Sequence, residues 1–475
     1  MNKRVTARAR IRSHLMPRGK LGWREYLYVG GMLLAFGLMV LGQLVWLPDP
    51  LHFGSGRRWI DILNGLVYTL ALVPVLWTAA AAGCVVSTLR SGRRLHTSKR
   101  SMIVIVLSLS AAAAIITLET KVASLTWAAG LLGAAWLAVF VDLAYTERQL
   151  TKRSRRTLTA FCGTLALLAF LFWPTNYMVT YPGLTMDMSR YAQAEGGKTE
   201  GRIDGVLIFH RPAFPVDWLY AKLFPHYSFE PIEKLGMPLG EYDELVREMK
   251  TDADAAASAI AYERLGSGAG IIAQGVRVTA IESGSPVLGI LRAGDIVTEM
   301  NEEPVLSVVE LNERMKNVPP GGWVQLTVTR QNEEVKFAVP TRADENLPER
   351  AAFGIRVQNV LYPDVPGRVT FRDYLVHEGG PSHGAMLTLA LIDQLTPEGI
   401  TGDIHVAGTG TIGPGGVVGS VGGVEQKAYT VHRAGADVFF VPAGQEDEAH
   451  KGAPELEIVP VRNLDDILNW LKSAA

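Results

Sequence analysis

Ser382 lies in a short glycine-rich segment, Gly380-Pro-Ser-His-Gly384, between two stretches of different character. The strand-like run 368–376 precedes it, and the apolar run 385–395, which has the composition of a helix, follows it. We therefore expect Ser382 on a turn at the start of a helix. The N–H groups of a first helical turn have no partner inside the helix and can stabilise a developing oxyanion. This setting suits a nucleophilic serine.

Two other interpretations of this segment are open. Gly380–Gly384 also matches the G-x-S-x-G turn of α/β-hydrolases. Only 93 residues follow Ser382, which are too few for the strands, acid and histidine that this fold places after its serine. A serine in a glycine-rich turn is also commonly a helix N-cap. The choice therefore depends on the rest of the region.

A second group of motifs follows at 407–427. It contains Ala-Gly-Thr-Gly-Thr-Ile at 407–412 and Gly-Gly-Val-Glu-Gln-Lys at 422–427, before a helix and the strand 438–442. With the segment around Ser382, this block closely resembles the proteolytic domain of Lon-family serine proteases, peptidase family S16, over about 120 residues. The family motifs G-P-S-A-G, G-T-G-T-I and G-G-I-x-x-K correspond to Gly380–Gly384, Gly408–Ile412 and Gly422–Lys427.

The resemblance implies an α+β proteolytic domain with a Ser-Lys dyad. It assigns Ser382 as the nucleophile, Lys427 as the base and Thr411 as the hydroxyl that orients the lysine amine. Gly380, Pro381 and His383 would shape the nucleophile turn and its oxyanion region. A lysine can accept the serine proton only if its amine is neutral near pH 7, roughly three units below its usual pKa. The valine- and alanine-rich surroundings of Lys427 fit a pKa lowered by burial.

Two features depart from the family pattern. His383 stands where alanine is usual; we expect it to line the cleft or face solvent, because adjacent residues at a helix start point in different directions. A Ser-His pairing is the alternative, and Glu378 is a further candidate for the cleft. The second departure is the ATPase module: Gly196-Gly-Lys-Thr199 lacks the first glycine of a phosphate-binding loop and is interpreted as a turn. The chain thus resembles the membrane-anchored, PDZ-containing Lon-like proteases that lack this module. We expect no cofactor and no metal.

Residues 266–343 alternate short strands with turns and resemble a PDZ domain of the bacterial protease-associated kind. Arg292-Ala-Gly-Asp-Ile-Val297 is the most diagnostic piece. Such domains add an extended peptide to a sheet edge and hold its C-terminal carboxylate in a backbone nest. The expected peptide-binding positions are Gly266, Gly268, Gly270, Gly275, Val276 and Val278. A small β domain that only separates the protease from the membrane is the alternative.

Five apolar stretches could each cross a bilayer as a helix, which takes about 20 residues. They lie at 27–47, 62–86, 101–118, 122–144 and 157–173, after a basic tail at 1–26. The first lacks a cleavage site for a signal peptide and is expected to remain as an anchor. The tail, the 2–3 loop and the 4–5 loop hold 18 Lys and Arg residues, against three in the other two loops. By the positive-inside rule the N-terminus is cytoplasmic and everything after about residue 173 is extracytoplasmic.

The expected architecture is therefore multi-domain: a helical transmembrane region, an α/β collar at 174–265, the PDZ-like domain and the proteolytic domain at 344–475. Residues 1–173 carry a net charge of +15 and the remainder −16, so nucleic acid is not expected as a partner. Expected partners are polypeptides, C-terminal peptides on the PDZ-like domain and membrane lipid, with a homo-hexamer as the assembly that Lon-type domains suggest. The main alternative function is a catalytically inactive, membrane-tethered PDZ adaptor.

Overall fold

The computed structural model describes residues 22–53, 57–91, 95–118, 122–151, 153–199, 201–235, 238–282, 284–331, 333–344, 347–377 and 379–474. The chain divides into two compact units. Unit 1 comprises Met1–Thr185, Leu207–Pro238 and Asp373–Glu378, and unit 2 comprises Met186–Val206, Leu239–Arg372 and Gly379–Ala475.

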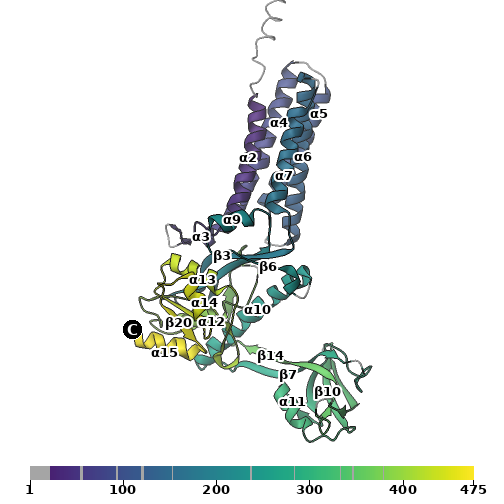
Figure 1. Cartoon of the computed structure of the whole chain (residues 1–475), viewed down its shortest axis with the longest axis vertical. Helices are drawn as coiled ribbons and strands as arrows, with labels where there is room; N and C mark the ends of the chain where they lie inside the picture. Colours follow the sequence, from purple (N-terminus) through teal and green to yellow (C-terminus); the bar gives the residue numbers. More distant parts are fainter. Residues whose placement is uncertain are drawn as a thin grey trace, which may run out of the picture. The chain divides into compact units, whose positions relative to one another are not determined.

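Five helical stretches of unit 1 are long and apolar enough to cross a membrane, at 23–43, 59–89, 99–116, 126–149 and 155–172. Helices α2, α4, α5, α6 and α7 run alongside one another in Figure 1, and the second stretch joins α3, a 3-10 turn and α4. The elements are α2 (Trp23–Gln43), α3 (Trp59–Leu66), α4 (Leu72–Ser91), α5 (Leu95–Ile116), α6 (Val122–Thr151) and α7 (Arg155–Phe172). The five predicted stretches are confirmed as helical, except that the first helix ends at Gln43 and not at residue 47.

These helices pack through a shared cluster of buried side chains. Trp77 of α4 is almost fully buried and donates its indole N–H to the Tyr28 carbonyl at 3.2 Å. A Cβ on Gly31 would lie 2.4 Å from the Trp77 ring, so the glycine permits this close approach. Asp142, also buried, accepts hydrogen bonds from Arg24 at 3.0 Å and Tyr28 at 3.2 Å. The acid is therefore compensated within the bundle.

The remainder of unit 1 holds a short sheet and a strap that comes from much later in the chain. β3 (Tyr177–Asp187) pairs antiparallel with β6 (Ser228–Pro231), and α9 (Asp217–Leu223) precedes β6. The strap, residues 373–377, binds α3: the Tyr374 hydroxyl donates to Asp61 at 3.0 Å, and the Leu375 N–H donates to Asn64 at 2.9 Å. The strap directly precedes the segment that contains Ser382.

Unit 2 contains a parallel arrangement of strands covered by helices. β16 (His405–Gly408) pairs in parallel with β19 (Val438–Pro442) and with the start of β5 (Arg202–Pro212), while β20 (Ile458–Val461) pairs in parallel with β19. β4 (Ala192–Ala194) pairs with β15 (Val369–Phe371). The helices are α8 (Met188–Tyr191), α10 (Leu239–Arg264), α12 (Gly384–Leu395), α13 (Val424–Ala434), α14 (Glu446–Gly452) and α15 (Leu464–Ala474).

The predicted collar at 174–265 is not a domain of its own, because its residues are divided between the two units. Residues 186–206 and 239–265 belong to unit 2, where β4 pairs with β15 and the start of β5 pairs with β16. The turn predicted at Gly196-Gly-Lys-Thr199 is confirmed.

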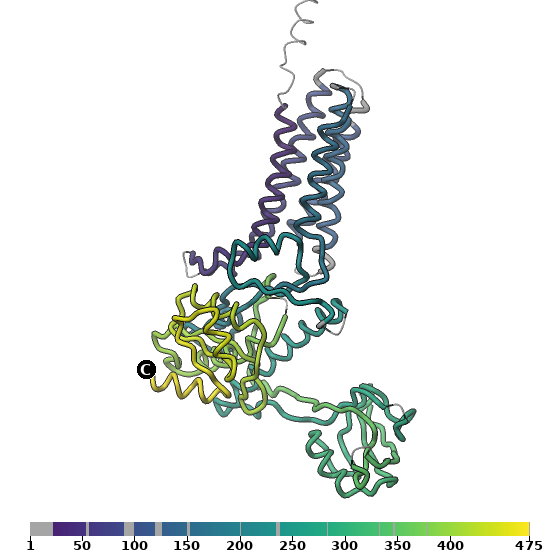
Figure 2. Tube along the Cα trace, viewed as in Figure 1, coloured from purple at the N-terminus to yellow at the C-terminus, as the bar shows by residue number. Residues whose placement is uncertain are grey.

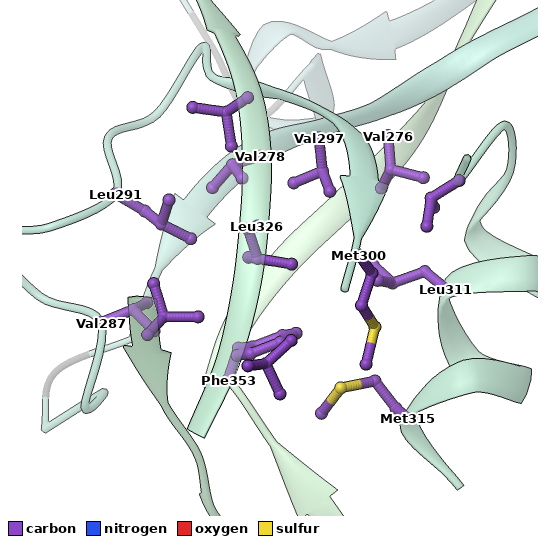
Figure 3. Packing of buried hydrophobic residues seen from close by; sticks show 14 of the residues in the cluster. Val276, Val278, Val287, Leu291, Val297, Met300, Leu311, Met315, Leu326 and Phe353 are labelled. Carbon is purple, nitrogen blue, oxygen red and sulfur yellow. The ribbon is translucent and has the colours of Figure 1, made fainter. Parts of the chain in front are cut away.

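A separate β domain is built from strands in the order β11-β10-β8-β7-β14. Its elements are β7 (Gly270–Ile281), β8 (Ile296–Met300), β9 (Glu303–Pro304), α11 (Val308–Met315), β10 (Trp323–Arg330), β11 (Glu333–Pro340), β12 (Arg342–Ala343), β13 (Ala351–Ala352) and β14 (Ile355–Asp364). Leu311 and Met315 of α11 cover one side of its core, with Leu326 at the centre (Figure 3). The predicted boundary at 343 is too early, because β14 pairs with β7 along its whole length (Figure 2).

Candidate active site and peptide groove

The turn that carries Ser382 leads directly into α12, as predicted. The Gly384 N–H donates to the Pro381 carbonyl at 3.1 Å, and the Leu387 N–H donates to the His383 carbonyl at 2.9 Å. Gly380 has φ +96°, a region that favours glycine. A Cβ on Gly384 would lie 2.9 Å from the Ile412 side chain, so the glycine lets the 408–412 segment approach the helix start. Ser382 itself is half-buried.

Backbone hydrogen bonds fasten this turn to the second motif. The Ser382 carbonyl accepts the Gly410 N–H at 2.8 Å and the Thr409 hydroxyl at 3.1 Å. The Ala385 N–H donates in turn to the Gly410 carbonyl at 3.1 Å. Segments 380–384 and 408–412, which were singled out separately in the sequence, therefore form one structure.

Lys427 reaches the same place from α13. Its side chain is 2% exposed, and its amine donates to the Thr409 hydroxyl at 3.0 Å. Because that hydroxyl donates to the Ser382 carbonyl, a single threonine links the lysine to the residue proposed as nucleophile. The structure thus brings together the Lys427 amine, the Thr409 hydroxyl and the Ser382 backbone.

The surroundings of Lys427 favour its neutral form. Val424 and Ala428 on its own helix are fully buried, as are Ala407 and Phe439 on the neighbouring strands. Burial lowers the pKa of Lys427 from 10.5 to about 7, although the nearby charge of Glu448 acts in the opposite direction. An amine with such a pKa can accept a proton at neutral pH.

Thr409, and not Thr411, contacts the lysine. Thr411 was predicted to orient the amine, but it lies in β17 (Thr411–Ile412), where it pairs with Gly419 of β18 (Val418–Gly419). Thr409 follows the end of β16 and is buried between the nucleophile turn and α13. The two threonines have different neighbours because β16 ends at Gly408, just before Thr409, and the next strand, β17, begins at Thr411.

His383 also differs from its prediction. It was expected to line the cleft or face solvent, but its side chain is 2% exposed, and its Nε2 lies 2.8 Å from Oδ1 of Asp254 on α10. The His383 side chain thus turns toward another helix, α10. Glu378 lies outside the described residues.

The peptide-binding positions predicted in the β domain lie at the end of α10 and along β7. β14 pairs with one side of β7, and β8 pairs with the other side at Val276 and Arg277. Val276 and Val278 are fully buried in the core, and Gly275 lies in the same strand. Gly266 takes part in the end of α10, where its N–H donates to Glu263. Gly268 and Gly270 lead from that helix end into β7.

A different surface of the β domain is hollow. A cavity of about 410 Å³ lies between α11 and the start of β14 and is lined by Leu311, Met315, Phe353, Ile355 and Val357, with polar residues at its rim. β14 is the last strand of the sheet, so its outer edge can accept an extended peptide. Gly354, with φ +63°, forms a bend at one end of this edge. At the other end the Val308 N–H donates to the Asn359 side chain at 2.7 Å.

Two family models match parts of the chain. Residues 365–473 match the model of the Lon protease (S16) C-terminal proteolytic domain, and residues 247–341 match that of the PDZ domain. The chain contains a Lon-type proteolytic domain and a PDZ domain. The five apolar helices lie outside both matched regions.

Curated relatives are similar over the Lon-type domain. The Lon protease of Chloroflexus aggregans is 31% identical over 156 residues, which are 32% of this chain and 18% of that protein. The Lon protease of Mycoplasma pneumoniae is 37% identical over 98 residues, 20% of this chain and 12% of that protein. The chain therefore spans less than a fifth of the length of these relatives.

Two solved PDZ domains are also similar, those of SdrC-like proteins from Listeria monocytogenes and Listeria innocua. They are 20% and 25% identical, and each match covers 18% of this chain, with 87% and 92% of the solved chain and TM-scores of 0.17.

The sequence interpretation missed two residues near the Lon-type site. Thr409 could have been considered, because it is the other threonine of the Gly-Thr-Gly-Thr motif. Asp254 carried no local signal, since it lies in an acidic, alanine-rich helix 129 residues before its histidine. Among the described residues, no group of three His, Cys, Asp or Glu side chains could hold a metal ion.

Proposed function

We propose that the protein is a membrane-anchored serine endopeptidase that works without ATP through a dyad of Ser382 and Lys427. The observation that carries this proposal is the buried Lys427 amine, with a pKa of about 7, linked through Thr409 to the backbone of Ser382. Burying a lysine costs stability, and the neutral amine that burial produces is the form that can act as a general base. The match to the Lon-type domain supports a serine peptidase.

In the proposed mechanism, Ser382 Oγ attacks the peptide carbonyl while Lys427 Nζ takes the hydroxyl proton. Lys427 then gives that proton to the leaving amine, and an acyl-enzyme forms. Water attacks the ester in the second half, and Lys427 again accepts and returns the proton. Thr409 keeps the amine in place. The Gly380, Gly384 and Ala385 N–H groups already bond to protein carbonyls and Pro381 has no N–H, so we assign the oxyanion to the N–H of Ser382.

The five apolar helices support a multi-pass protein of a bacterial cell membrane. The excess of Lys and Arg in the tail and in alternate loops supports a cytoplasmic N-terminus, with the PDZ and proteolytic domains extracytoplasmic. In that location, without an unfolding motor, suitable substrates are unfolded or flexible exported and membrane proteins, as in protein quality control.

The PDZ domain would select or regulate through peptide C-termini. We assign the peptide to the edge of β14, where the apolar cavity and the Gly354 bend lie together. We further propose that the protein forms a homo-hexamer, contacts membrane lipid and needs no cofactor.

The deciding experiment measures cleavage of casein and of an unfolded peptide, without ATP, by the full chain in detergent. Wild type is compared with Ser382→Ala and Lys427→Ala. Loss of activity in both variants is expected. Activity that survives Lys427→Ala would refute the dyad. An inactive wild type, even with added C-terminal peptides, would favour a PDZ adaptor that lacks catalysis.

A further inference from the structure

We infer that Asp254 is a positioning residue of the protease: through His383 it fixes the turn that carries Ser382. This inference rests on the proposed function. Asp254 belongs to α10, which precedes the first strand of the PDZ sheet, β7, whereas Ser382 and His383 follow its last strand, β14. The contact therefore joins two parts of the proteolytic fold that the inserted domain separates in sequence.

α10 contacts the nucleophile turn at two points. The Gly380 N–H donates to the Val246 carbonyl at 2.9 Å, and His383 Nε2 meets Asp254 Oδ1 at 2.8 Å. Val246 and Asp254 are eight residues apart, close to two helical turns, so they share one face of α10. A Cβ on Gly379 would lie 2.4 Å from the Val246 side chain, which shows how closely the helix and the turn approach.

The hydrogen bonds around Asp254 specify the orientation of His383. The Tyr191 hydroxyl donates to both carboxylate oxygens, at 2.9 and 2.7 Å. A carboxylate that also meets the imidazole Nε2 acts there as the acceptor, so Nε2 carries the hydrogen. Tyr191 is 1% exposed and packs edge-on against His383, with ring centroids 5.6 Å apart. The Lys250 amine lies 5.5 Å from the Tyr191 ring centre.

This network acts on the nucleophile because His383 is the next residue after Ser382. The His383 carbonyl also accepts the Leu387 N–H, so the position of His383 sets the first turn of α12. A displaced turn would move Ser382 relative to Lys427, which is held separately by α13. Misplacement of a reacting group by about 1 Å can cost about 100-fold in rate. Nε2 points to Asp254, so His383 holds the turn while Lys427 remains the base.

The test compares kcat and KM of the full chain in detergent for wild type, Asp254→Ala, His383→Ala and the double variant. We expect each single variant to lose about 10- to 100-fold in kcat with little change in KM, and the double variant to lose no more than either single one. Asp254→Asn keeps an oxygen acceptor and should retain most of the activity. The pH at which activity rises should stay the same in every variant, because the base is unchanged.

Asp204→Ala is the matched control. Asp204 is fully buried in the same domain and meets His405 Nε2 at 2.7 Å, so its loss removes a comparable pair that does not contact the nucleophile turn. Equal losses of kcat in Asp204→Ala and Asp254→Ala, measured per folded molecule, would overturn the inference. So would full activity in folded Asp254→Ala, or multiplicative losses in the double variant.

Hydrogen exchange of peptides from 379–391 separates this inference from the proposed function. Exchange there should be faster in Asp254→Ala than in wild type and in Asp204→Ala, whether or not the protein cleaves a substrate. Faster exchange with an inactive wild type would support the positioning contact and reject the proteolysis. Unchanged exchange in Asp254→Ala would reject the contact even if the wild type is active.

Discussion

Replacing Lys427 by methionine should abolish activity and stabilise the proteolytic domain. Each pKa unit corresponds to about 1.4 kcal/mol, so a pKa lowered from 10.5 to about 7 means that the buried lysine costs the folded state up to about 5 kcal/mol at neutral pH. Methionine fills similar space without a charge. It loses the hydrogen bond to Thr409, worth about 1 kcal/mol, which leaves an expected gain of about 4 kcal/mol.

The gain should depend on pH with a defined sign. The unfolded chain keeps the lysine proton up to pH 10.5, whereas the folded chain releases it near pH 7. Between these values the unfolded state binds more protons, so the stability of the wild type rises with pH. Methionine does not titrate. The advantage of Lys427→Met should therefore shrink by about 1.4 kcal/mol per pH unit, from about 4 kcal/mol at pH 7 to about 1 kcal/mol at pH 9.

Hydrogen exchange measured by mass spectrometry on peptides from α12 and β19 gives the local free energy of opening in the full chain. Lys472→Met, at an exposed position of α15, is the matched control and should change exchange little at any pH. If Lys427→Met were no more protected than wild type at pH 7, or if its advantage did not vary with pH, the assignment of a buried neutral amine would be refuted.

Three further outcomes are expected. The kcat/KM of wild type should rise with pH through about 7 and then level off, because the neutral amine of Lys427 is the base; a profile without this rise would contradict the assignment. Thr409→Val should lower kcat about 10- to 100-fold because the Lys427 amine loses its hydrogen bond, whereas Thr411→Val should change kcat less than about twofold. Steady-state kinetics with the opposite order would show that Thr411 orients the amine. Met315→Glu should weaken binding of an apolar C-terminal peptide at least about 10-fold by placing a charge in the groove, as measured by fluorescence anisotropy; Val309→Glu, on the exposed side of α11, is its control, and equal effects would move the groove elsewhere.

The sequence was sufficient for features set by local chemistry. The turn at Ser382 and the burial of Lys427 follow from glycines, prolines and apolar neighbours within a few residues, and both were predicted. The five long apolar helices were recognised for the same reason. Nearby residues did not show which of Thr409 and Thr411 contacts Lys427, because this depends on which threonine follows the end of β16, next to α13.

Contacts between distant segments could not be predicted. The edge strand of the PDZ sheet is β14, whose pairing with β7 joins Asp364 to Gly270, 94 residues earlier in the sequence. The orientation of the His383 side chain depends on Asp254, which lies 129 residues earlier in the sequence. The division of the collar could not be predicted because β4 and β5 pair with β15 and β16, which follow the PDZ domain in the sequence.

The strap at 373–377 has a practical consequence for anyone who expresses part of this protein. A fragment that begins after the last apolar helix would contain Tyr374 and Leu375 but would lack Asp61 and Asn64, their partners on α3. The segment before Ser382 would then lack its hydrogen bonds to α3. Low activity in such a fragment could therefore come from the loss of these bonds, so its rate should be compared with that of the full chain.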